Sequence, residues 1–384
     1  MLVQTINQIA DLAPYQLRWD ELAGDCPFRS WLWLSTWWKH YESAHKLQVL
    51  LVFAESNTAT ACANEISCRP SWQASEKLLA ILPAYVETSR TQGRVLRLLG
   101  DGEVCSEHLD LLCEPQEIDH VCQALADHLT THAEQWDSLK LTTLAEGNRN
   151  LDSLISALTM DGCEINRREG ANCWSIPLPT TWEEFLAMQS KSHRKQLRQL
   201  KSRVLESPRT FLFDVANCDE FDVAWEILID LHQRRRQSLG EPGCFASPTW
   251  ANFHREVALE LLAAGRLRLS ILLLDNEPVA AEYHLAGSDA TYAYQGGIDP
   301  ERCEDEPGQL SLILCIERAL AEGHTRFELL RGDEPYKAHW RAEPTPTSDV
   351  EVISPRTLAR WRHYSWNSLR RAGRLVRQFT NLLG

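Results

Sequence analysis

The feature that most constrains this chain is one continuous stretch, residues 306–340. Pro307-Gly308 breaks the chain directly before Gln309–Glu322, which is apolar on most faces and so predicts a buried helix. Gly323 stands where a helix C-cap is expected, and Thr325–Leu330 then predicts a short strand. A dense polar turn follows this strand. Because charged turns beyond strands commonly contact substrate, the stretch predicts part of a binding site.

The same stretch resembles the CelD/FemAB-like branch of the GNAT acyltransferases. The matching residues are Pro307-Gly308, Leu310, Gly323, Phe327, Leu329, Arg331-Gly332-Asp333-Glu334, Tyr336-Lys337 and Trp340. The resemblance covers about Thr180 to Ala342 and is weaker before that. It implies an α/β fold of two GNAT-like mixed-sheet domains, acyl transfer, and acetyl-CoA or another acyl-CoA as co-substrate rather than a permanently bound cofactor.

Length and element order are consistent with two domains of ordinary size in 384 residues. We expect an N-terminal domain over 1–170, a C-terminal acyltransferase domain over 171–350, and a basic amphipathic helix over 351–384. In the second domain, helices at Glu220–Arg236 and Pro248–Ala264 precede a three-stranded meander from Leu267 to Gly297. This order of helices, meander, helix and strand is that of a GNAT fold.

Charge and cysteine content exclude several classes of protein. The formal net charge of −14 argues against a general DNA or RNA binder, which needs a positive footprint. The N-terminus lacks the pattern of a signal peptide, so we expect a cytoplasmic protein with reduced thiols. Cys105, His108, Cys113, His120 and Cys122 lack the paired spacing of zinc ligands, and we expect no metal site.

Two helices in the chain have both a structural and a functional interpretation. Ser30–Tyr41 carries aromatic residues at helical spacing, which favours burial over a binding platform. Thr180 and Glu183 match a capping box, opening a helical region that includes the basic run Lys191–Arg203. That run is either a solvated face or an anion contact; the resemblance favours the contact, with His193 and Arg194 as substrate-binding candidates.

GNAT chemistry needs a cradle for the phosphates of the acyl donor, a donor to the oxyanion and a proton acceptor. By resemblance, the phosphates should lie at the helix start, on the N–H groups of Gly308, Gln309 and Leu310. The usual glycine-rich signature is reduced there to Pro307-Gly308-Gln309, which weakens the inference of coenzyme A. Glu282 is a candidate general base within an apolar strand, and alternation places His284 on its face.

The remaining site candidates follow from the resemblance and from proximity along the chain. Tyr336 would protonate the leaving thiolate, and Lys337 would stabilise developing negative charge or form a salt bridge that shapes the turn. Arg331 and Asp333 are substrate-binding candidates, and Tyr294 either faces the same cleft or packs.

The C-terminal segment carries seven arginines after residue 355 and no acidic residue after Glu351. With apolar residues at approximately helical spacing, it predicts an amphipathic helix that contacts an anionic membrane or docks on the acidic protein itself. Contact with nucleic acid is disfavoured by the acidic body.

Three functions are consistent with these features. The first is acyl transfer to an amine or hydroxyl of a sugar, polysaccharide precursor or small molecule. The second is FemAB-like aminoacyl transfer from charged tRNA to a cell-wall precursor. The third is a non-catalytic scaffold of a polysaccharide-synthesis complex. The acidic composition disfavours tRNA mildly.

Overall fold

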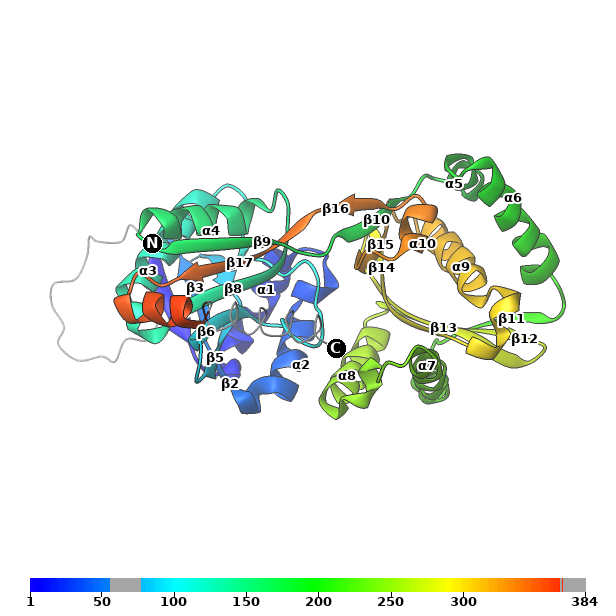
Figure 1. Ribbon diagram of the computed structural model, residues 1–384, viewed down its shortest axis with the longest axis horizontal. Helices are drawn as coiled ribbons and strands as arrows, with labels where there is room; N and C mark the ends of the chain where they lie inside the picture. The colour runs from blue at the N-terminus through cyan, green and yellow to red at the C-terminus, as the bar shows by residue number, and fades with distance from the viewer. Residues whose placement is uncertain (56–76, 367, 369–384) are drawn as a thin grey trace, which may run out of the picture. The chain divides into compact units, whose positions relative to one another are not determined.

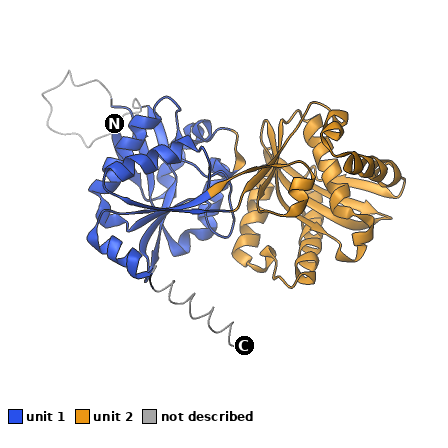
Figure 2. Ribbon diagram, turned by 45° about the horizontal axis from the view of Figure 1, so that its top comes forward, with its two compact units in different colours: residues 1–24, 28–170, 348–384 blue, residues 25–27, 171–347 orange. Residues whose placement is uncertain are grey.

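A computed structural model describes residues 1–55, 77–366 and 368, so the polar sequence at 57–75 lies outside the described residues. The chain divides into two compact units (Figure 2). The first unit combines residues 1–24, 28–170 and 348–384; the second combines 25–27 and 171–347. The second unit is therefore almost entirely one continuous segment between two parts of the first.

The first unit holds two sheets, of strand order β1-β3-β4-β7 and β2-β5-β6-β8-β17-β9. Its strands and helices (Figure 1) are β1 Leu2–Ile6, α1 Gln16–Ala23, α2 Trp31–Tyr41, β2 His45–Leu47, β3 Val49–Phe53, β4 Leu78–Leu82, β5 Ala84–Ser89, β6 Gly93–Leu98, β7 Leu112–Cys113, α3 Ile118–Thr131, β8 Ser138–Ala145, α4 Arg149–Met160, β9 Glu164–Glu169 and β17 Thr347–Ile353.

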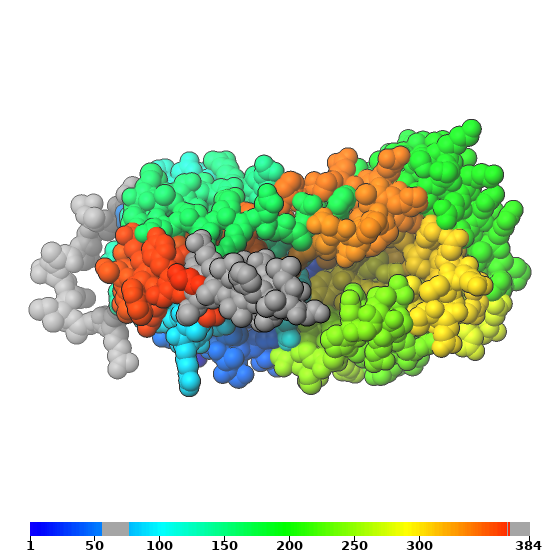
Figure 3. Space-filling view, in the orientation of Figure 1, coloured from blue at the N-terminus to red at the C-terminus, as the bar shows by residue number. Residues whose placement is uncertain are grey.

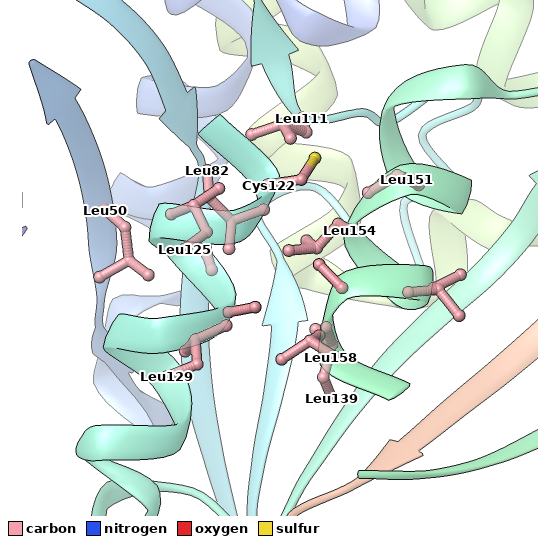
Figure 4. Packing of buried hydrophobic residues seen from close by; sticks show 14 of the residues in the cluster. Leu50, Leu82, Leu111, Cys122, Leu125, Leu129, Leu139, Leu151, Leu154 and Leu158 are labelled. Atoms are coloured by element: carbon pink, nitrogen blue, oxygen red, sulfur yellow. The ribbon is translucent and has the colours of Figure 1, made fainter. Parts of the chain in front are cut away.

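Helices α3 and α4 supply much of this unit's core. Leu125 and Leu129 of α3, with Leu154 and Leu158 of α4, point toward one another and toward Leu139 of β8 (Figure 4). All five are at most 1% exposed. Because their spacing is three or four residues, each helix presents one apolar stripe, as periodicity predicts.

Helix α2 confirms the prediction of a buried aromatic helix at residues 30–41. The Ser30 side chain caps it by accepting from Trp33 N–H at 3.3 Å. Trp33, Trp37 and Trp38 are buried, and Trp31 is only partly so.

The second unit is built on one sheet of order β11-β12-β13-β14-β15-β10-β16. Its elements are β10 Cys173–Pro177, α5 Trp182–Met188, α6 Lys191–Leu200, β11 Thr210–Asp214, α7 Cys218–Ser238, α8 Pro248–Ala263, β12 Leu267–Leu274, β13 Glu277–Ala286, β14 Ala290–Ile298, α9 Pro307–Ala321, β15 Arg326–Arg331, α10 Pro335–His339 and β16 Glu343–Thr345. The predicted meander, helix and strand are confirmed.

Strands β14 and β15 run parallel but stay paired only over their first three residues. The pairs run from Ala290↔Arg326 to Tyr292↔Glu328, after which β14 continues to Ile298 without pairing to described residues of β15. Helix α9 packs against both strands and against β13. The sheet thus opens on one side of β14, next to the start of α9.

The capping box at the start of α5 lies one residue later than predicted. Thr181 and Glu184 form it, with Glu184 N–H donating to Thr181 Oγ1 at 3.2 Å. The pair Thr180 and Glu183 has the same spacing, so spacing alone did not separate the two registers. Glu183 instead forms an ion pair with Arg198 at 2.6 Å.

The boundary at the end of the second unit also differs from the expected 350/351. Strand β17 pairs with β9 from Ser348↔Glu169 to Ile353↔Glu164, so these residues complete the first unit's sheet. Three residues assigned to the C-terminal helix, 351–353, are therefore strand.

Residues 357–366 are helical and pack on the first unit. Arg362 lies 3.0 Å from the Asp137 carboxylate, Arg356 lies 3.7 Å from it, and Arg360 lies 3.0 Å from Glu164. In this part of the tail the arginines face the acidic body, as the docking interpretation expects. Most of the predicted helix beyond residue 366 lies outside the described residues.

Candidate active site

Glu282 and His284 face the same side of β13, as alternation predicted. Glu282 Oε2 lies 3.0 Å from His284 Nε2, and Glu282 Oε1 accepts from the Ser311 hydroxyl at 2.6 Å. Ser311 belongs to the first turns of α9, so the helix that covers the sheet also binds the carboxylate. Glu282 retains 19% side-chain exposure, whereas His284 retains 3%. We call Glu282, His284 and Ser311 the carboxylate cluster.

The carboxylate cluster lies beside the open side of β14. Glu282 pairs with Gly296, which is beyond the last residue of β14 that pairs with β15. A Cβ on Gly296 would lie 2.8 Å from Glu282 Oε2. The glycine therefore gives the carboxylate room, and a side chain there would displace it.

Tyr336 lies close enough to Glu282 for the carboxylate to affect its ionisation. Burial of the phenol, with the negative charges of Glu334 and Glu282, raises the pKa of Tyr336 to about 12. The residue is nevertheless 48% exposed. A half-exposed phenol that remains protonated at neutral pH is suited to donate a hydrogen bond or a proton.

The sequence suggested that Lys337 lies in an exposed turn. In the structure it lies on α10 and is 2% exposed. Its Nζ donates to the carbonyl oxygens of Leu330, Arg331 and Gly332 at 3.2, 2.9 and 3.0 Å. It also lies 2.9 Å from the Glu334 carboxylate. An ammonium group with four oxygens around it has no donor left for substrate, since it carries three protons. The structural interpretation of Lys337 is therefore favoured.

Asp333 and Arg331 take part in the same turn. Asp333 Oδ1 accepts from Asn172 Nδ2 at 2.8 Å and from Trp174 Nε1 at 3.0 Å, which lowers the pKa of the carboxyl group. These bonds attach the turn to β10. Asp333 thus stabilises the conformation of the turn. The carbonyl oxygen of Arg331 accepts a hydrogen bond from Lys337 Nζ.

The start of α9 differs from the expected phosphate cradle. The N–H groups of Gln309 and Leu310 both donate to the Glu306 carbonyl, at 2.9 and 3.1 Å. The Glu306 carboxylate lies at the same helix end and accepts from Gln309 and Gln196. Of the three predicted donors only Gly308 N–H has no described hydrogen-bond partner, and a carboxylate there repels phosphate. This geometry disfavours the predicted cradle at Gly308, Gln309 and Leu310, which stays a prediction.

Positive charge gathers instead on the outer face of α6. An open hollow of about 580 Å³ runs along this helix. It is lined by Lys191, Arg194, Lys195, Arg198, Gln199 and Ser202. Figure 3 shows the α5–α6 region, in green, on the surface of the second unit. Arg194, predicted to contact substrate, is on this face. We call it the basic face of α6.

His193 is on the opposite side of α6 from the hollow and is 1% exposed. Its ring lies 3.9 Å from that of His339 and meets Trp340 edge-on at 5.1 Å. Burial, together with the positive charge of His339 and Arg341, lowers the pKa of His193 to about 4. Its predicted contact with substrate is therefore wrong, because the core of the unit holds it neutral.

Tyr294 is on the other face of the sheet from Glu282. Its hydroxyl lies 2.9 Å from His254 Nε2 of α8, and its ring packs on Tyr283. The β13–β14 register shifts between Tyr283↔Gln295 and His284↔Ala293, so Tyr294 is the extra residue of a β-bulge. Tyr294 therefore packs, as the alternative interpretation held.

Sequence reasoning did not single out Ser311 or a second polar group, Cys244 with His232. Ser311 is a lone hydroxyl among the apolar residues of α9, and that contrast was the available signal. Cys244 and His232 are twelve residues apart and approach only because the chain folds back after α7. No group of three or more potential metal ligands occurs among residues 1–55 and 77–366. Within the same residues, no helix is both long and apolar enough to cross a bilayer.

Comparison with known proteins agrees with the geometry. Residues 191–338 match the acetyltransferase (GNAT) domain family. No curated protein matches the sequence significantly. Among solved structures, FemX superposes with a TM-score of 0.61 at 10% identity, over 91% of this chain and 97% of that chain.

Two further structures are similar over most of their length. A conserved protein of unknown function from Bacteroides thetaiotaomicron VPI-5482 has a TM-score of 0.53 at 9% identity, covering 92% of this chain and 100% of that one. The C-terminal domain of a putative lysylphosphatidylglycerol synthetase from Agrobacterium fabrum has a TM-score of 0.50 at 9% identity, covering 91% and 94%. Identities this low show a shared fold alone. The chain thus has a fold of two GNAT-like units, and most of its second unit is similar to the acetyltransferase (GNAT) domain family.

Proposed function

We propose that the protein transfers an acyl group from acyl-CoA to an amine or hydroxyl of a sugar, polysaccharide precursor or small molecule. The observation that carries this proposal is the carboxylate cluster, because it joins a partly exposed carboxylate to the open side of β14 inside the matched domain. A carboxylate with two fixed donors keeps one orientation and still has lone pairs for a substrate proton.

In this reaction Glu282 takes the proton of the attacking amine or hydroxyl. The nucleophile attacks the thioester carbonyl, the bond from carbon to sulfur breaks, and Tyr336 gives a proton to the leaving thiolate. The pKa of Tyr336, raised to about 12, keeps that proton available at neutral pH. Ser311 and His284 act by holding Glu282 in place.

The donor's phosphates need positive charge, and the start of α9 does not supply it. We assign them to the basic face of α6, where Lys191, Arg194 and Lys195 line one hollow. Gln196 of the same helix donates to Glu306 at 2.8 Å, which ties α6 to the start of α9. A donor bound along α6 is thus placed on a helix that contacts the start of α9, the helix that carries Ser311.

We further propose a cytoplasmic location with peripheral contact to an anionic membrane through residues 356–384. Support comes from the composition of the segment and from Trp361 and Tyr364, which are 66% and 57% exposed although large and aromatic. Aromatic side chains of this kind favour the interface between lipid and water. Such contact suits an acceptor that is attached to a lipid.

The test of function is mass analysis of candidate amines and sugars incubated with the protein and a series of acyl-CoAs. We expect at least one acceptor to gain an acyl group, and Glu282→Gln to suppress the gain. Glu277→Gln is the matched control, because Glu277 is on the same strand but is exposed. If the protein transfers a group from aminoacyl-tRNA but from no acyl-CoA, aminoacyl-tRNA replaces acyl-CoA as the proposed donor. If it transfers from neither, the result supports a non-catalytic scaffold.

A further inference from the structure

A second polar group lies on the face of the sheet opposite the carboxylate cluster. Cys244 Sγ is 3.3 Å from His232 Nε2, and His232 Nδ1 is 3.1 Å from the Gly296 carbonyl oxygen. A carbonyl can only accept, so Nδ1 carries the imidazole proton and Nε2 is the free base. The Cys244 thiol therefore donates to His232. This is the geometry of an activated nucleophile, in which a base accepts the thiol proton and a third group orients the base.

Gln295 completes the arrangement. Its Nε2 donates to Cys244 Sγ at 3.3 Å, and its Oε1 accepts from Gly296 N–H at 3.2 Å. The backbone contact fixes which end of the amide faces the sulfur. The β-bulge at Tyr294 brings Gln295 to this face, since Gln295 pairs with Tyr283 while Gly296 pairs with Glu282.

The two groups of the pair differ in burial. His232 is 2% exposed and Cys244 is only partly buried. Burial raises the pKa of Cys244 to about 12 and lowers the pKa of His232, so both groups are neutral before reaction. The loop before Cys244 is fixed by Gln233 Nε2, which donates to the Pro242 carbonyl at 2.9 Å.

We propose that Cys244 and His232 form a nucleophilic dyad that takes the acyl group of an activated thioester onto the protein. The Cys244 thiol proton passes to His232 Nε2 as sulfur bonds to the carbonyl carbon. The donor's bond from carbon to sulfur then breaks, and the departing thiolate takes the proton from His232. One thioester is exchanged for another, so no oxidant or reductant is needed. Only the identity of acyl-CoA as donor rests on the proposed function.

The chain offers a matched control in Cys303. This thiol is exposed, and its described hydrogen bonds are to the carbonyl oxygens of Asp299 and Pro300, with no histidine among them. Exposure alone therefore predicts that Cys303 reacts first, whereas the dyad predicts that Cys244 reacts first. Cys303→Ser should leave acylation of Cys244 unchanged.

The experiment treats the intact protein with p-nitrophenyl acetate, and separately with acetyl-CoA, and identifies the acylated residue by peptide mass mapping. We expect acylation of Cys244 with both reagents. His232→Asn should slow it by roughly a hundredfold or more, as loss of a general base does. Glu277→Gln should leave it unchanged, because Glu277 is an exposed residue at the start of β13.

Four outcomes distinguish the dyad from its alternatives. Acylation of Cys303 in preference to Cys244, or equal rates in wild type and His232→Asn, would overturn the dyad. Cys244→Ala that still gains the acyl group at the same rate would also overturn it. The protein could also acylate Cys244 from p-nitrophenyl acetate in a His232-dependent way and yet transfer nothing from any acyl-CoA. That result would refute the proposed function and support the dyad.

Discussion

Replacement of Lys337 by alanine should unfold the turn that follows β15. Its ammonium group binds three backbone carbonyls and the Glu334 carboxylate from a position that is 2% exposed. The turn it holds is not relaxed, since Leu330 and Gly332 have φ of +58° and +116°. Residues other than glycine rarely adopt positive φ, so the Leu330 conformation depends on these bonds.

The magnitude follows from what is left unpaired. The Glu334 carboxylate is 56% exposed, so water solvates it once the lysine is gone and its loss of a partner costs little. Each buried carbonyl left without a donor costs about 1–3 kcal/mol. The bond to the Leu330 carbonyl is buried and those to Arg331 and Gly332 are partly buried, so we expect a loss of about 2–4 kcal/mol in the free energy of unfolding. For a unit of this size that corresponds to a fall in melting temperature of roughly 10 °C.

Urea denaturation followed by circular dichroism measures the loss, and amide hydrogen exchange at Gly332 locates it. The Gly332 N–H donates to the Asn172 carbonyl at 3.0 Å, so its protection reports whether the turn stays attached to β10. Lys337→Met is the control, because it restores the volume without the donors. An alanine variant that melts like wild type but transfers no acyl group would refute this reasoning and return Lys337 to a catalytic role.

Three further predictions address the base, the buried histidine and the tail. Glu282→Gln should lower kcat/KM by roughly a hundredfold or more while Glu277→Gln does not, and steady-state rates check this; equal rates would remove Glu282 from the mechanism. The pKa of His193 is lowered to about 4 in the folded protein, so between pH 6.5 and pH 4 the unfolded chain binds a proton at this residue and the folded chain does not. The free energy of unfolding should therefore fall as the pH is lowered from 6.5 toward 4, by about 3 kcal/mol for this group. The test measures the urea midpoint as a function of pH in His193→Gln and in the exposed control His120→Gln. If the midpoint changes with pH by the same amount in both variants, the prediction for His193 is contradicted. Finally, the full chain should co-sediment with anionic vesicles more than a chain ending at Pro355, and less so at high salt, since charge attraction is screened within about 10 Å at 0.1 M; equal sedimentation would assign the tail to intramolecular packing.

Periodicity and turn signals predicted the elements of the second unit well, because each reports local chemistry. Leu267–Leu274 is a strand over the predicted residues, and the α9 helix and β15 strand follow as expected. Alternation also placed Glu282 and His284 together correctly, since two residues of one strand share a face whatever their partners are.

Predictions that depended on partners in other elements were less successful. The face of Tyr294 depends on the register of β14 against β13, and a bulge is not visible in a pattern of single residues. The burial of Lys337 requires that α10 fold back beneath three carbonyls of the preceding strand and turn. For the same reason the contact between His232 and Cys244, from separate elements, had no local signal.

The return of the chain through β17 bears on the order in which the protein folds. Nearly all of the second unit is one unbroken segment, so it is complete once about residue 347 has been synthesised. The first unit must wait, because β17 lies between β8 and β9 in its larger sheet and arrives only with residues 347–353. Until then β9 lacks the strand with which it pairs. The half of the protein that is translated first is therefore the half that is finished last.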